Sequence, residues 1–83
     1  MDAMTTRIDH LVALIAKSLV DYPQEVAVTM IEGTNTVVLE LRVAKEDMSK
    51  VIGRQGGTVQ AMRTLIGAVA GKINKRTVLE ILE

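Results

Sequence analysis

The chain of 83 residues has no cysteine, tryptophan or phenylalanine, and it has one tyrosine and one histidine. Without cysteine there are no disulfides, thiolate metal ligands or cysteine nucleophiles. Because Tyr22 is the only aromatic residue, base recognition by aromatic stacking is nearly excluded. A lone histidine, His10, argues against histidine metal sites and catalytic dyads. We therefore expect no metal, no cofactor and no enzyme activity.

The sequence also lacks a long apolar run. The longest run near the N-terminus spans residues 11–16, too short for a signal-peptide core or a membrane span. Apolar residues make up 48% of the chain and charged residues 24%, which is typical of a folded domain. This length allows one small domain over residues 1–83 that is marginally stable alone. We expect a cytoplasmic protein with no membrane partner.

A formal net charge of zero conceals an uneven distribution. Residues 1–44 contain three basic and six acidic residues, whereas residues 45–76 contain seven basic and two acidic residues. A locally basic segment can attract a polyanion even in a neutral protein, because the attraction depends on the nearby potential. On charge alone, ordinary solvated side chains are the better explanation.

Hydrophobic periodicity predicts six elements. Apolar residues recur at helical spacing in three segments of the sequence. In two other runs, apolar residues fall at every second position; these runs flank the turn residues Gly33-Thr34-Asn35 and predict a β-hairpin. The last helix carries a core stripe of Val59, Met62, Ile66, Val69 and Ile73. The expected bounds are helix 5–20, strands 26–31 and 36–43, helices 45–52 and 57–72, and strand 77–82.

The order α-β-β-α-α-β predicts an α+β fold. A right-handed crossover through two helices should place the last strand parallel and adjacent to the second. The expected sheet is three-stranded and mixed, with strand 36–43 in the centre and three helices on one face.

A glycine cluster joins the two basic helices in the run Val51-Ile52-Gly53-Arg54-Gln55-Gly56-Gly57-Thr58-Val59. The second helix should present unpaired backbone N–H groups and the positive end of its dipole, which favour an anion. Gly56 and Gly57 lack Cβ atoms, so a phosphodiester can approach the main chain. Arg54 can pair with a phosphate. As a helix cap and a turn, the glycines would need no ligand, but that role does not explain three of them in five positions.

This run resembles the VIGxxGxxI signature of KH domains, whose Gly-x-x-Gly loop clamps about four nucleotides of single-stranded RNA. Gly53 and Gly56 match the two fixed glycines, and Val59 stands where isoleucine is usual. Two strands before the motif and one after it match the type II arrangement. The length, the N-terminal helix and residues 61–65 are similar to the small stand-alone bacterial KH proteins of the KhpA family, so the resemblance covers essentially the whole chain.

The resemblance implies a single type II KH domain over residues 1–83 that binds single-stranded RNA in the cytoplasm, often as an RNA chaperone or post-transcriptional regulator. It also implies a homodimer or a heterodimer with a larger KhpB (Jag-like) KH protein, with a link to cell shape and cell wall biogenesis in some bacteria. Phosphates are expected at the glycine loop, and bases along its apolar flanks and the edge of the final strand. The expected RNA-binding residues are Lys50, Val51, Ile52, Gly53, Arg54, Gln55, Gly56, Gly57, Thr58, Val59 and Arg63.

A second, shallower apolar stripe on the last helix, formed by Ala61, Leu65 and Ala68, predicts a dimer interface. Ordinary burial within the monomer would explain the same stripe. The alternative function is a protein-interaction subunit that keeps the fold and acts mainly through dimerisation with a larger KH partner, in which case this stripe is the functional surface.

Overall fold

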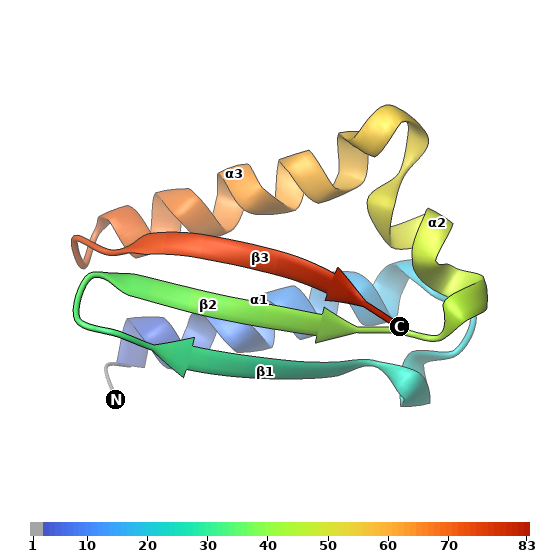
Figure 1. The fold of residues 1–83 in the computed structure, drawn as a ribbon, viewed down its shortest axis with the longest axis horizontal. Coiled ribbons are helices and arrows are strands. Elements are labelled where there is room, and N and C mark those ends of the chain that lie inside the picture. Colours follow the sequence, from blue (N-terminus) through green and yellow to red (C-terminus); the bar gives the residue numbers. More distant parts are fainter. Residues whose placement is uncertain (1–2) are drawn as a thin grey trace.

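The computed structural model describes residues 3–83 and confirms the predicted α+β fold in the order α-β-β-α-α-β (Figure 1). Short 3₁₀ turns join several of the elements. The helices are α1 (Ala3–Leu19), α2 (Met48–Ile52) and α3 (Gly57–Gly71), and the strands are β1 (Ala27–Glu32), β2 (Thr36–Arg42) and β3 (Arg76–Leu82). The 3₁₀ turns are η1 (Pro23–Glu25), η2 (Lys45–Asp47) and η3 (Arg54–Gly56).

The sheet is mixed, with β2 in the centre as predicted. β1 pairs antiparallel with β2 and sets Met30 opposite Leu39, while β3 pairs parallel with β2 and sets Leu39 beside Leu79. The hairpin requires the first pairing, and the crossover through α2 and α3 produces the second. Both outer strands therefore keep a free edge, and α3 lies along the one that belongs to β3 (Figure 1).

One face of the sheet carries the core. Along β2, Val37, Leu39 and Leu41 are fully buried, whereas Val38 and Glu40 on the opposite face are partly exposed. Helices α1 and α3 supply most of the rest of the buried cluster, and α1 passes behind the strands in Figure 1. The burial pattern thus follows the strand period of two and leaves the other face of the sheet open. The buried helical residues are Ile8, Val12, Ala16, Val51, Val59, Met62, Ile66 and Ala70.

Most predicted bounds differ from the observed ones by one or two residues. The largest change is in the expected helix 45–52, which is a 3₁₀ turn followed by the five-residue helix α2. In α3 the buried stripe ends on Ala70, while Val69 and Ile73 are only partly buried. Among the described residues, none lies in a helix that is both long and apolar enough to cross a membrane.

Candidate functional site

The connection between α2 and α3, Gly53 to Gly57, is an abrupt turn that we call the elbow (Figure 1). Three of its residues have positive φ: Gly53 at 79°, Gln55 at 55° and Gly56 at 74°. Glycine adopts such angles readily, but a left-handed glutamine costs roughly 1–2 kcal/mol. Strained backbone persists only where its surroundings hold it, and it concentrates at ligand-binding segments. The elbow is therefore a candidate site on backbone geometry alone.

The glycines of the elbow have two different structural roles. A Cβ built on Gly53 would lie 2.3 Å from Thr58 Oγ1 and 2.8 Å from Thr58 N, so the first turn of α3 packs directly on this glycine. A Cβ on Gly56 or Gly57 would meet nothing within 4 Å. Gly53 is thus required for packing, whereas Gly56 and Gly57 leave bare backbone facing open space.

The N-terminus of α3 opens onto this bare backbone. No side chain caps it, since Gly56 occupies the N-cap position. The N–H of Gly57 bonds to the Arg54 carbonyl, and the next N–H groups of the first turn have no intrahelical partner by helix geometry. Together with the helix dipole, these donors favour an anion beside the elbow.

The apolar flanks of the elbow differ in exposure. Val51 is fully buried and Val59 is 6% exposed, so both belong to the core and support the elbow from inside. Ile52 is partly exposed and packs against the core cluster. Of the three apolar residues predicted to contact bases, Ile52 has the most surface to offer.

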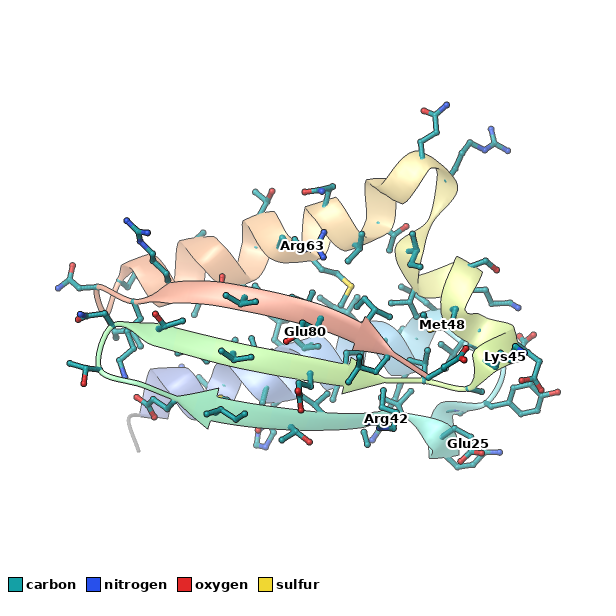
Figure 2. All side chains as sticks on the ribbon, in the orientation of Figure 1. Glu25, Arg42, Lys45, Met48, Arg63 and Glu80 are labelled. Atoms are coloured by element: carbon teal, nitrogen blue, oxygen red, sulfur yellow. The ribbon has the colours of Figure 1, made fainter. Side chains whose placement is uncertain are left out.

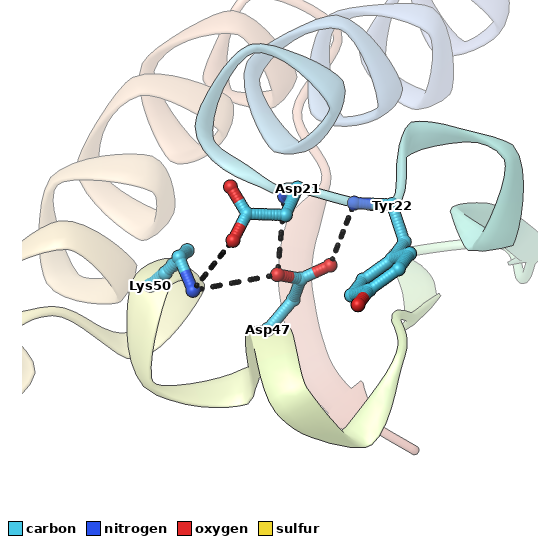
Figure 3. Close-up of polar contacts among 4 residues, drawn as sticks. All are labelled: Asp21, Tyr22, Asp47 and Lys50. Carbon is cyan, nitrogen blue, oxygen red and sulfur yellow. Dashed lines mark hydrogen bonds and ion pairs between the residues drawn. The ribbon is translucent and has the colours of Figure 1, made fainter.

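The cations near the elbow also differ. Arg54 and Gln55 are exposed at its tip. Lys50, by contrast, faces two carboxylates, with its Nζ 3.2 Å from Asp21 Oδ2 and 3.6 Å from Asp47 Oδ1 (Figure 3). The hydrogen bond to Asp21 and the attraction of both carboxylates raise the pKa of Lys50 above 10.5. Its charge is compensated within the protein.

Asp47 is the buried polar residue that anchors α2. It is fully buried and accepts hydrogen bonds from the backbone N–H of Asp21 at 3.1 Å and of Tyr22 at 3.0 Å (Figure 3). The sequence placed Asp47 only within the first turn of the expected helix 45–52. The two N–H groups that it accepts from lie more than 20 residues away in the chain, and no local pattern signals them.

Arg63 leaves α3 toward β3 (Figure 2). Its Nη2 donates a hydrogen bond of 3.1 Å to the carbonyl of Leu79. The sequence predicted Arg63 as an RNA-binding residue but gave no sign of this bond. This hydrogen bond places the Arg63 guanidinium group between α3 and β3.

The predicted interface stripe on α3 is exposed. Ala61, Leu65 and Ala68 all lie on the surface, and 53% of Leu65 is accessible. Burial within the monomer, the ordinary explanation of this stripe, therefore does not apply. Leu14 of α1 is 65% exposed and lines a surface pocket together with Val69 of α3.

Comparison with known proteins agrees with these features. Residues 9–81 match the family described as "KhpA/KhpB, KH domain". The chain belongs to this family. The match spans the elbow and all three strands, so the fold is that of a KH domain.

Curated relatives of the KhpA type resemble nearly the whole chain. A protein of Clostridium acetobutylicum named "RNA-binding protein KhpA" is 56% identical over 73 residues, which cover 88% of this chain and 97% of the relative. Proteins of the same name from Aquifex aeolicus and Borreliella burgdorferi are 55% and 51% identical and are covered to 92% and 90%. No solved structure gave a significant match.

These relatives are named as binding proteins, and the KH family is not one of enzymes, in agreement with the sequence-based expectation. Within residues 3–83, the structure brings together no group of three or more His, Asp or Glu side chains that suits a metal ion.

Proposed function

We propose that this protein binds single-stranded RNA in the cytoplasm, with the sugar-phosphate backbone lying against the elbow. The observation that carries the proposal is the open space at Gly56 and Gly57 beside the uncapped start of α3. Phosphate oxygens would accept hydrogen bonds from the free N–H groups of α3 and from the Arg54 guanidinium. The name of the KhpA relatives supports RNA as the ligand.

Apart from Arg63, each of the predicted RNA-binding residues has a part in this proposal. Arg54, Gln55, Gly56 and Gly57 form the contact surface, while Gly53 and Thr58 hold its shape. Val51 and Val59 support it from the core, and Ile52 offers apolar surface to a base. Lys50 lies close to the contact surface but adds little attraction, because Asp21 and Asp47 compensate its charge. With two or three phosphates bound, log affinity should fall with log salt at a slope of about −1.4 to −2.1.

The test is the double substitution Arg54→Asp with Gln55→Asp. Both side chains are exposed, and aspartate tolerates the left-handed conformation of position 55, so the fold should be unaffected. We expect the loss of measurable binding to an RNA oligonucleotide in fluorescence anisotropy, with an unchanged circular dichroism spectrum and melting temperature.

A matched control keeps the charge change and moves it away from the elbow. Arg7→Asp with His10→Asp alters two exposed residues of α1 by the same total charge at neutral pH. This variant should lose only the affinity that long-range attraction supplies. Equal losses in both variants, or retained binding in the elbow variant, would show that the elbow is not the contact.

A second candidate function is protein–protein interaction through the α3 stripe of Ala61, Leu65 and Ala68. The observation that favours it is the exposure of Leu65, at 53%, on a helix whose opposite side is in the core. The occupant would be a second copy of the chain or a KhpB-type KH protein. A dimer would hold two elbows and raise the avidity for RNA. A role as an RNA chaperone or post-transcriptional regulator, and a link to cell shape and cell wall biogenesis, are proposed from the resemblance to the KhpA family alone.

Sedimentation equilibrium tests the stripe, and RNA affinity then separates the two functions. We expect a dimer at high micromolar concentration that Leu65→Glu converts to the 9.0 kDa monomer, while Thr64→Glu on the neighbouring exposed position has less effect. A protein that acts only through this stripe would lose its partner with Leu65→Glu. It would not bind RNA, so the elbow substitutions would have no effect on it.

A further inference from the structure

The outer edge of β3 carries backbone groups that pair with no other strand. Arg76 N–H bonds to the Asn35 carbonyl, and the Leu82 carbonyl bonds to Val43 N–H, so the even-numbered residues of β3 direct their backbone groups toward the sheet. Strand geometry alternates these directions, and the backbone of Leu79 therefore points to the free edge. Arg63 of α3 bonds to the Leu79 carbonyl at that edge.

Arg63 keeps most of its donors after making this bond. A guanidinium group has five N–H donors in a planar fork, and Leu79 takes one that belongs to Nη2. If that N–H is on the Nε side, the pair formed by Nη1 and Nη2 stays complete. If it is on the other side, the pair formed by Nε and Nη2 stays complete. In either case one two-point donor pair is left, and the Leu79 carbonyl fixes its orientation.

The position of this donor pair follows from the helix. Arg63 is six residues after Gly57, about 9 Å along the axis of α3 from the elbow, and its side chain points toward β3. A strand whose phosphates lie at the elbow would direct its bases along the same flank of α3. Arg63 is then placed to meet the edge of a base, while Arg54 meets phosphate. This step rests on the proposed function.

We propose that Arg63 is a specificity-determining residue that selects bases with two adjacent hydrogen-bond acceptors. Guanine offers O6 and N7, which arginine binds at two points. Cytosine offers N3 and O2. Uracil separates its two carbonyl oxygens by the N3–H donor, and adenine places the N6 amino donor beside N7 or N1. The preferred ligand is therefore RNA rich in cytosine or guanine over RNA rich in uracil or adenine.

The test compares the RNA octamers C8 and U8, which have the same backbone, length and ring size. Fluorescence anisotropy should give an affinity for C8 at least about fivefold above that for U8, the lower end of the range for a two-point contact. The substitution Arg63→Lys keeps the charge but removes the planar fork, and it should bring the two affinities together with the salt dependence unchanged.

The matched control is Arg76→Lys, at an exposed arginine that begins β3, and it should keep the C8 preference. Equal binding of C8 and U8 by the unchanged protein, or a preference that survives Arg63→Lys, would overturn the proposal. A merely structural bond to Leu79 would lower the melting temperature without altering the ratio of affinities. A phosphate contact would survive Arg63→Lys, and Arg63→Met would then weaken C8 and U8 equally and reduce the salt slope by about 0.7.

The outcomes also separate this proposal from the proposed function. If the protein binds both octamers equally and Arg54→Asp with Gln55→Asp abolishes that binding, the elbow stands and the role of Arg63 fails. If the protein binds neither octamer at any protein concentration used, both proposals fail together.

Discussion

The two ends of α2 use polar groups in opposite ways. At its start, the carboxylate of Asp47 is fully buried and engages two backbone N–H groups and Lys50 (Figure 3). At its end, helix geometry leaves the first backbone N–H groups of α3 without intrahelical partners, and Arg54 is exposed beside them. One end satisfies its hydrogen bonds internally, and the other keeps them available for a ligand.

This contrast explains how so small a helix can position a binding surface. α2 has only five residues and would not be stable by itself. Asp47 ties its start to the corner at Asp21 and Tyr22, and Thr58 packs on Gly53 at its end. The elbow is held from both sides, so its backbone can remain open without collapsing onto the protein. Rigid support beneath an exposed donor set is the arrangement that binding sites need.

Asp47→Ala removes the internal acceptor at the start of α2. This change leaves two partly buried backbone N–H groups without their acceptor and removes one of the two carboxylates that face Lys50. Losing such a buried acceptor costs about 3 kcal/mol of unfolding free energy. Urea unfolding should show a clear shift of the midpoint to lower urea.

The neighbouring Glu46 provides the control for Asp47, because it has the same charge, stands one residue earlier and is exposed. Glu46→Ala should change the unfolding free energy by less than about 0.5 kcal/mol. If the two alanine variants unfold at the same urea concentration, Asp47 is not an anchor and the two ends of α2 do not differ as described.

At the other end of α2, substitutions of the elbow glycines should differ in their effect on stability. Gly53→Ala should destabilise the protein by about 2 kcal/mol, since the new Cβ meets Thr58 and the φ of 79° disfavours alanine. Gly57→Ala has open space and a φ of −63°, so it should leave stability equal or raise it by about 0.5 kcal/mol. Thermal melts compare the two.

RNA affinity should follow a different order from stability. Gly57→Ala places a methyl group where the proposed phosphate approaches, so it should weaken RNA binding several-fold in a protein that is at least as stable as the original. A stable Gly57→Ala variant with full RNA affinity would mean that the ligand does not approach the backbone at this position.

The sequence predicted the fold because each element has a clear period. Strict alternation marks β2, and the hairpin and crossover rules then determine the order and direction of the strands. The elbow was predicted as well, from three glycines within five residues. Helical periodicity predicted that Val59 is buried, as it is, whereas its place in the motif suggested a base contact.

The partners of the charged residues could not be predicted from the sequence. Lys50 meets Asp21, and Arg63 meets the Leu79 carbonyl, through the packing of elements that are far apart in the chain. Neither contact leaves a local pattern, because each requires only that a long side chain reach its partner across the fold. A basic residue next to a motif therefore does not reveal by itself whether its charge is free for a ligand.

Removing the Lys50 side chain should change stability least, and the pH dependence of that change tests whether the charge of Lys50 is free for a ligand. Its pKa is raised above 10.5, first by the hydrogen bond to Asp21. Below pH 10.5 the lysine is charged in both the folded and the unfolded protein, so its stabilising contribution is complete. Above that pH the unfolded chain loses the proton first, and the contribution disappears as the pH passes the raised value of the folded state.

The measurement is the difference in urea midpoint between the unchanged protein and Lys50→Met, followed from pH 8 to pH 12. Taking the difference removes the titration of the other lysines, so only the contribution of Lys50 remains. We expect a small difference that is constant up to about pH 10 and then declines. A difference that stays level to pH 12 would mean that Asp21 and Asp47 do not hold this charge, and Lys50 would then be as available to phosphate as Arg54.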